Sequence, residues 1–346
     1  MLVGFELLAN HSWRRLCMTD KREISWDVVK GFAIIAVILI HTTSSDSMAG
    51  VVWRQFINWP VALFFFIGGY FCHVHCSYRA FIIRKIRRLL VPLGVVSLCY
   101  MTIDVAVRVK SGVNVSFPDV VVAFLSFPFG WGYFILALFQ CFLMVPFILK
   151  LPLRKSLAIA FGGYLLALLW VYLGSTICVG KVSMSYMMPY VFGTTWLPFF
   201  VLGCGLQKKR FTWPDNLFVW MGFLLCILCV AIISGIWWSE IATVQLARSQ
   251  IRLSCGLFAF VLSLGLPNLF DRFDLAGRGF YLIAQLGQIS LFAYLWHRLV
   301  LLLFRKFLPS MLLQIPLLPI CVILFFVLIA CIIPAGWRRR FWWIGF

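Results

Sequence analysis

The sequence predicts an all-α fold, a polytopic bundle of about ten transmembrane helices with both termini in the cytoplasm. Three observations support this fold class: 63% of the residues are hydrophobic, 12% are charged, and the mean hydropathy is +1.00. Soluble globular proteins are about half apolar and about a quarter charged. The chain therefore has too few polar side chains to cover a water-soluble surface, which excludes a soluble enzyme with a single anchor.

Apolar stretches follow one another along the chain, each close to the roughly 20 residues that a helix needs to cross a bilayer. Residues 1–25 lack the apolar core of a signal peptide and are expected to form a cytoplasmic N-terminal segment. Residues 336–346 are expected to form a basic, aromatic cytoplasmic tail. We predict spanning helices at residues 26–45, 56–75, 89–108, 131–149, 155–173, 189–206, 216–236, 252–270, 281–304 and 314–335.

The charge of the chain is +19, from 30 basic and 11 acidic residues, and it determines the predicted orientation. With the N-terminus inside, most Lys and Arg residues fall in segments on the cytoplasmic side, as the positive-inside rule requires. Because membrane orientation accounts for the basic clusters, nucleic acid is not expected as a partner. We expect the surrounding membrane lipids to contact these clusters instead.

The first predicted helix carries three ionisable residues, Asp27, Lys30 and His41, and ionisable residues inside a membrane span are functional candidates by default. Lys30 and His41 are eleven residues apart, which is three helical turns plus about 20°, so they share a face about 16 Å apart along the axis. Asp27 and Lys30 are i,i+3 neighbours and can pair. The alternative is that Lys30 reaches interfacial water along its aliphatic stem and that His41 is a hydrogen-bonded core residue.

A second histidine, His297, lies at about the same depth in its predicted span, because both helices run from the inside to the outside. A site shared by His41 and His297 is therefore geometrically allowed. The alternative is that His297 makes a structural hydrogen bond between helices. Its neighbour Arg298 points about 100° away on the helix and is expected to reach the outer interface or a glycan.

A basic cluster follows the second predicted helix and contains Arg84, Lys85, Arg87 and Arg88. Arg84, Arg87 and Arg88 have i, i+3 and i+4 spacing and share one face of an α-helix. Arginine binds phosphate groups in a bidentate manner, so this face is a candidate phosphate site. The alternative is an ordinary cytoplasmic anchor that contacts anionic lipid headgroups.

A metal site is not expected. Cys72 and Cys76 flank two histidines with i,i+4 spacing and could chelate. Structural zinc normally requires four well-spaced ligands, and no second Cys/His pair follows. Chance is the better explanation of this cluster.

Five segments in order resemble conserved segments of the membrane acyltransferase-3 family. The first has a basic residue, ten intervening residues and a histidine, here Lys30 and His41. The third contains the basic cluster and ends at Pro92, and the fifth has a Ser, Tyr and His pattern that ends at His297. The five segments are residues 26–41, 60–71, 81–92, 197–203 and 286–297.

The resemblance extends over residues 22 to about 335, so that residues 26–335 form one acyltransferase-3-like domain. Two positions depart from the family pattern. Gly68 stands where the family usually has Ser, and either Trp131 or Tyr133 occupies the aromatic position at the start of the fourth helix.

Members of this family transfer short acyl groups, most often acetyl from acetyl-CoA, to hydroxyl groups of glycans, lipid-linked sugars or small molecules. The resemblance implies that His41 is catalytic and that Lys30, with Asp27, is its charged partner, while His297 joins the catalytic set. It also implies that the CoA phosphates are bound by the basic cluster, and it makes Tyr133 a candidate for donor binding.

An imidazole titrates near neutrality, so His41 could act as the base for an acceptor hydroxyl or carry the acyl group for one step. We expect an O-acetyltransferase of the bacterial inner membrane whose acceptor is a lipid-linked or polymeric glycan, such as O-antigen, enterobacterial common antigen or exopolysaccharide. The alternatives are acylation of a small molecule and transport. Buried His, Lys and Asp suit a proton-coupled carrier, whereas the lack of an inverted repeat disfavours one.

Overall fold

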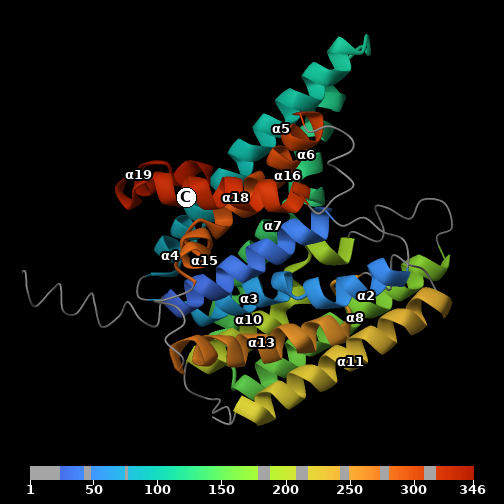
Figure 1. Cartoon of the computed structure of the whole chain (residues 1–346), viewed down its shortest axis with the longest axis vertical. Helices are drawn as coiled ribbons and strands as arrows, with labels where there is room; N and C mark the ends of the chain where they lie inside the picture. Colours follow the sequence, from blue (N-terminus) through green and yellow to red (C-terminus); the bar gives the residue numbers. More distant parts are fainter. Residues whose placement is uncertain are drawn as a thin grey trace, which may run out of the picture.

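The computed structural model describes residues 24–42, 48–74, 77–177, 188–207, 217–241, 249–272, 280–307 and 317–346. The regular structure in these ranges is helical (Figure 1). The first helix is Ile24–Thr42. The others are α2 (Met48–Ile57), α3 (Pro60–Tyr70), α4 (Tyr78–Lys85), η1 (Ile86–Leu90), α5 (Val91–Lys110), α6 (Phe117–Gly130), α7 (Tyr133–Lys150), α8 (Leu153–Ile177), α10 (Gly193–Gln207), α11 (Leu217–Ile241), α13 (Leu253–Arg272), α15 (Tyr281–Gln288), α16 (Ser290–Phe307), α18 (Leu317–Ile332), α19 (Ala335–Arg340) and η2 (Trp342–Ile344).

The predicted all-α membrane fold is confirmed, but a count of ten spans is not. Among the described residues, 6 helices are long and apolar enough to cross a membrane, and a bent pair could make a seventh. Each predicted span contains a helix, yet several are short. A helix such as α18, with 16 residues, is about 24 Å long, whereas the hydrocarbon layer is about 30 Å thick.

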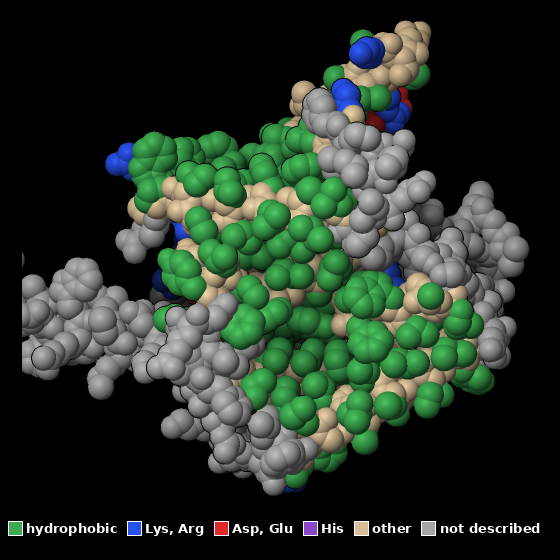
Figure 2. Space-filling model, viewed as in Figure 1, with side chains coloured by type: hydrophobic (Ala, Val, Ile, Leu, Met, Phe, Trp, Pro, Cys, Tyr) green, Lys and Arg blue, Asp and Glu red, His purple; other side chains and the backbone are tan. Residues whose placement is uncertain are grey.

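The outer surface of the bundle is apolar, as lipid contact requires. Figure 2 shows a face on which most visible side chains are hydrophobic. Along α11, large hydrophobic side chains such as Phe223, Leu225 and Ile233 are more than half exposed. The protein is therefore a multi-pass integral membrane protein.

The hairpin formed by α5 and α6 differs from the prediction, in which residues 109–130 connect two spans. Figure 1 shows α5 extending away from the rest of the bundle. The start of α6 is defined by a capping box in which the Ser116 backbone N–H donates to the Asp119 carboxylate at 2.9 Å. Ser116 and Asp119, with Pro118 between them, are a helix-start signal that the sequence contains.

The predicted span at 281–304 is not one straight helix. It is broken at Ile289 into α15 and α16, which are bent by 85°. Glycine allows α15 to lie against the first helix: a Cβ added to Gly287 would be 1.8 Å from the Asp27 carbonyl oxygen, and one added to Gly31 would be 2.1 Å from the Ile283 carbonyl oxygen. This close backbone contact fixes the position of α15 beside Asp27 and Lys30.

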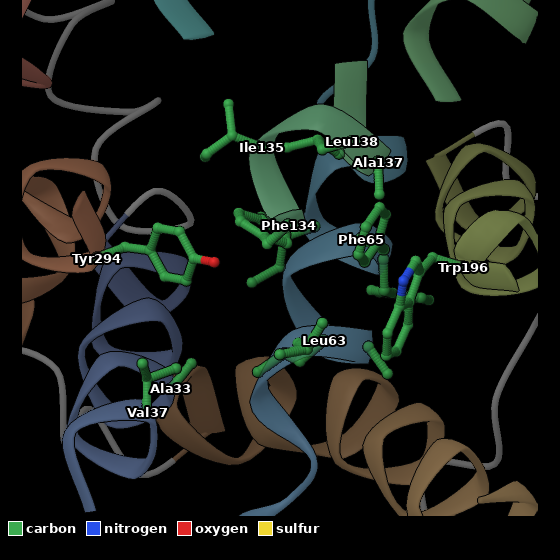
Figure 3. Close-up of a cluster of buried hydrophobic side chains, with 14 of the residues drawn as sticks. Ala33, Val37, Leu63, Phe65, Phe134, Ile135, Ala137, Leu138, Trp196 and Tyr294 are labelled. Atoms are coloured by element: carbon green, nitrogen blue, oxygen red, sulfur yellow. The ribbon is translucent and has the colours of Figure 1, made fainter. Parts of the chain in front are cut away.

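A second helix pair, α3 and α10, is also joined through glycines and forms the centre of the core. A Cβ on Gly203 would lie 2.1 Å from the Phe66 carbonyl oxygen, and one on Gly69 would lie 1.9 Å from the Phe200 carbonyl oxygen. Small residues allow this approach in membrane helices. Beside the contact, the rings of Phe65 and Trp196 stack with their centroids 5.2 Å apart, as Figure 3 shows.

We expect Gly203→Ala to destabilise the protein, because the added methyl group would meet backbone atoms rather than a flexible side chain. Overpacking of this kind costs about 1–3 kcal/mol. Gly222→Ala on α11 is the matched control, since a Cβ there meets nothing within 4 Å. Thermal unfolding of the two variants in detergent would measure the difference. Equal unfolding temperatures would contradict the α3–α10 contact.

Candidate active site

The structure brings His41 and His297 together. Their ring centroids are 5.0 Å apart and the rings are nearly parallel, at 29°. His41 lies at the C-terminal end of the first helix. His297 lies on α16 and is buried, with 2% of its surface exposed. Because α16 begins after the break at Ile289, His297 lies about two turns into its helix rather than deep within one long span. The expected proximity of the two histidines is therefore achieved by a bent helix.

One hydrogen bond determines which nitrogen of His297 is basic. The distance between His297 Nδ1 and the Tyr294 carbonyl oxygen is 2.6 Å. A carbonyl oxygen only accepts, so Nδ1 carries the hydrogen, and in the neutral imidazole Nε2 then keeps its lone pair. His297 Nε2 is buried and has no hydrogen-bond partner within the described part of the chain. A buried basic nitrogen beside a second imidazole is an arrangement suited to proton transfer.

Trp131 is the aromatic residue beside the histidines. Its ring centroid is 5.1 Å from that of His41, and the Arg298 guanidinium carbon lies 3.9 Å from the Trp131 ring centroid. The Trp131 carbonyl oxygen accepts a hydrogen bond of 2.8 Å from the Tyr294 hydroxyl. Arg298 thus stacks on a tryptophan next to the histidine pair. The sequence left the choice between Trp131 and Tyr133 open.

Tyr133 has a different environment. Its hydroxyl donates to Gln250 Oε1 at 2.9 Å, and its ring is 5.5 Å from that of Tyr190. The structure does not bring it to the cavity described next.

A cavity of about 540 Å³ lies beside the other end of the first helix. Its charged lining residues are Asp27, Lys30, Lys85 and Arg88, and the rest of its wall is largely aromatic and aliphatic. Gly68, which replaces the usual Ser of the family pattern, also lines it. The cavity therefore combines a cationic region with apolar walls.

The ion pair predicted on the first helix is confirmed. Lys30 Nζ is 2.5 Å from Asp27 Oδ1, and the same ammonium lies 5.9 Å from the Phe71 ring centroid. Lys30 lines the cavity, whereas His41 contacts His297 at the opposite end of the same helix. The first helix therefore connects the cavity with the histidine pair.

Only part of the basic cluster faces the cavity. Lys85 and Arg88 line the cavity, and Arg84 and Arg87 are not among its lining residues. The expected common face of Arg84, Arg87 and Arg88 assumed a continuous α-helix, but residues Ile86–Leu90 form a π-helical turn. A π turn changes the angular spacing of side chains and often marks a functional site. Lys85 is further held by the Phe142 ring, 3.8 Å from its Nζ.

Tyr294 connects the two parts of the site. Its side chain lines the cavity, its hydroxyl donates to Trp131, and its carbonyl oxygen accepts from His297. Neither His41 nor His297 lines the cavity itself. The sequence pattern included Tyr294 between Ser290 and His297, but no spacing argument assigned it this position.

Metal ligands do not gather in the part of the chain that the structure describes, where no group of three or more His, Cys, Asp or Glu side chains could hold an ion. Of the Cys/His cluster considered above, His75 and Cys76 lie outside the described residues.

The helical membrane fold, the histidine pair and the cationic cavity define a class, that of integral membrane proteins with an internal polar site. A family model described as an acyltransferase domain matches residues 23–336. The chain therefore belongs to the acyltransferase 3 family, and this membership implies acyltransferase activity. No curated protein and no solved structure matches the chain significantly.

Proposed function

We propose that the protein transfers an acetyl group from cytoplasmic acetyl-CoA to a hydroxyl of a cell-surface glycan or of its lipid-linked precursor, in the bacterial inner membrane. The observation that carries this proposal is a histidine pair connected by one helix and by Tyr294 to a cavity with cationic residues. Acyl transfer to a hydroxyl requires a base, and CoA requires a phosphate site. The two parts of the site meet these two requirements.

The cavity is our proposed donor site. CoA is anionic through its phosphates, and Lys85 and Arg88 provide cationic groups at the cavity wall. The apolar walls suit the less polar arm of CoA, which bears the thioester. With the N-terminus in the cytoplasm, as the basic residues predict, the cavity opens toward the cytoplasm, where acetyl-CoA is made. The histidine pair then lies toward the outer half of the membrane.

The reaction at the histidine pair follows one of two balanced routes. In direct transfer, an imidazole nitrogen accepts the hydroxyl proton while the oxygen attacks the thioester carbonyl, the C–S bond breaks, and the proton passes to the CoA sulfur. In the two-step route, a His41 nitrogen attacks the thioester carbonyl, the C–S bond breaks and CoA leaves as a thiolate; the acceptor oxygen then attacks the acyl-imidazole, the C–N bond breaks, and the hydroxyl proton passes to the CoA sulfur. Arg298, stacked on Trp131 beside His41, would supply positive charge near the oxyanion in either route.

If the donor binds in the cavity, only those basic residues that line it should affect the KM for acetyl-CoA. We expect Lys85→Ala and Arg88→Ala to raise the KM for acetyl-CoA about ten-fold or more, because one charge-assisted hydrogen bond contributes about 1.5–3 kcal/mol. Arg84→Ala and Arg87→Ala remove the same charge from the same segment but outside the cavity lining, and they should change the KM little. Initial rates in membrane vesicles would measure this. A uniform effect of all four variants would instead indicate a lipid-anchoring role.

Mass spectrometry of the surface glycans tests the proposed function directly. Cells that carry the gene should yield glycans about 42 Da heavier per acetylated unit than cells that lack it, since an acetyl group replaces one hydroxyl hydrogen. Identical glycan masses would contradict the glycan acceptor. Loss of glycan export with unchanged acetylation would favour a transporter.

A further inference from the structure

Two aromatic side chains form part of the cavity wall, and one of them, Tyr294, also contacts the histidine pair. Phe134 on α7 and Tyr294 on α16 both line the cavity, and their ring centroids are 5.0 Å apart in an edge-to-face arrangement. Figure 3 shows the two side chains facing each other. We call this pair the aromatic partition. The Tyr294 ring of this pair lies 5.9 Å from the His297 ring, so the partition is the part of the cavity wall that contacts the histidine pair.

The aromatic partition is held rigidly from both sides. Phe134 is 5% exposed and packs against Phe65 at 5.1 Å and Phe64 at 5.7 Å between ring centroids. Tyr294 is 6% exposed, and its hydroxyl is bonded to the Trp131 carbonyl oxygen. Both rings are packed against neighbouring groups, so the partition limits the room at this part of the cavity wall.

When the CoA phosphates bind at Lys85 and Arg88, the acyl group is the part of the donor that points toward the histidine pair. To react, the thioester carbonyl must come within reach of the histidine pair, and the acyl chain must then fit at or past the partition. A methyl group requires little room there, whereas each further methylene would displace a packed ring. Packed interiors resist such displacement, and a pocket that discriminates by one methylene does so by roughly 10- to 200-fold.

We propose that Phe134 and Tyr294 determine the acyl-chain length that the protein accepts. This inference rests on the proposed acyl transfer from CoA and names the residues that select the donor. Phe134 is the more informative position, because Tyr294 also holds His297 through its backbone carbonyl.

The test compares acetyl-CoA with hexanoyl-CoA as donors for the purified full-length protein in proteoliposomes with a glycan acceptor. The parent should prefer acetyl-CoA by about ten-fold or more in kcat/KM. Phe134→Ala should reduce this preference at least about ten-fold, and Phe134→Leu should reduce it by less.

Phe142→Ala is the matched control. Phe142 lines the same cavity and is equally buried, but it lies against Lys85, away from the partition. It should alter the KM for both donors alike and leave their ratio unchanged.

Three results would overturn the inference: equal use of both donors by the parent, an unchanged ratio in active Phe134→Leu, or the same shift in ratio in Phe142→Ala. If Phe134→Ala does not fold, Phe134→Leu decides. A parent that transfers neither acyl group would instead refute the proposed function, and the inference with it.

Discussion

Replacing His41 with alanine is expected to reduce acyl transfer at least about 100-fold, while binding of acetyl-CoA is retained. General base catalysis contributes about 10²- to 10⁴-fold, and the loss would be complete if His41 carries the acyl group. Donor binding should persist because His41 does not line the cavity that contains Lys85 and Arg88. The measurement is the transfer of radiolabelled acetyl from acetyl-CoA to glycan in membranes, with donor binding measured in parallel.

The control for His41→Ala is His73→Ala, which removes an exposed histidine outside the cavity lining and should leave transfer unchanged. Parental activity in the His41→Ala membranes would show that the catalytic assignment is wrong. Incubation of the parent with labelled acetyl-CoA in the absence of acceptor separates the two chemical routes. Label that stays on the protein, and is lost in His41→Ala, would favour the two-step route.

Replacing His297 with glutamine is expected to lower kcat by about 10²- to 10⁴-fold, the contribution of a general base, with little change in the KM for acetyl-CoA. Glutamine preserves a polar side chain of similar reach, but its amide does not take up a proton near neutral pH. The expectation follows from the Nε2 lone pair of His297, which is buried beside His41 and lacks a hydrogen-bond partner in the described ranges.

The alternative role of His297 is a structural hydrogen bond within α16, through Nδ1 and the Tyr294 carbonyl oxygen. A glutamine side chain could replace that donor. Near-parental kcat in His297→Gln would therefore assign His297 to structure rather than catalysis. Unfolding temperatures of the parent and of His297→Gln distinguish a chemical loss from a folding loss.

The sequence predicted correctly those features of the site that depend on the geometry of a single helix. The i,i+3 spacing of Asp27 and Lys30 predicted an ion pair, and the two side chains form one. The first helix is continuous from Ile24 to Thr42, so Lys30 and His41 belong to one rigid element. Family resemblance and predicted depth pointed to His41 and His297, whose rings are in contact distance.

The sequence was insufficient where tertiary contacts change the helix. Next to the break at Ile289, Gly287 packs closely on the backbone of the first helix, and hydropathy does not report such a contact. The π turn at Ile86–Leu90 departs from the ideal α-helical spacing that predicted one face for Arg84, Arg87 and Arg88, and the cavity lining contains Lys85 and Arg88 instead. The choice between Trp131 and Tyr133 for the aromatic position stayed open, because the position of Trp131 depends on how α16 packs against α7.

The long element that contains α4, η1 and α5 runs through 33 residues, from Tyr78 to Lys110. At 1.5 Å per residue it measures about 50 Å, some 20 Å more than the roughly 30 Å hydrocarbon layer. With Arg84, Lys85, Arg87 and Arg88 at one end and Arg108 and Lys110 at the other, the surplus length is charged at both ends. We therefore expect the turn around Gly112, where the backbone adopts a φ of 74°, to lie outside the hydrocarbon layer, which makes it a natural place for an epitope tag or an antibody fragment.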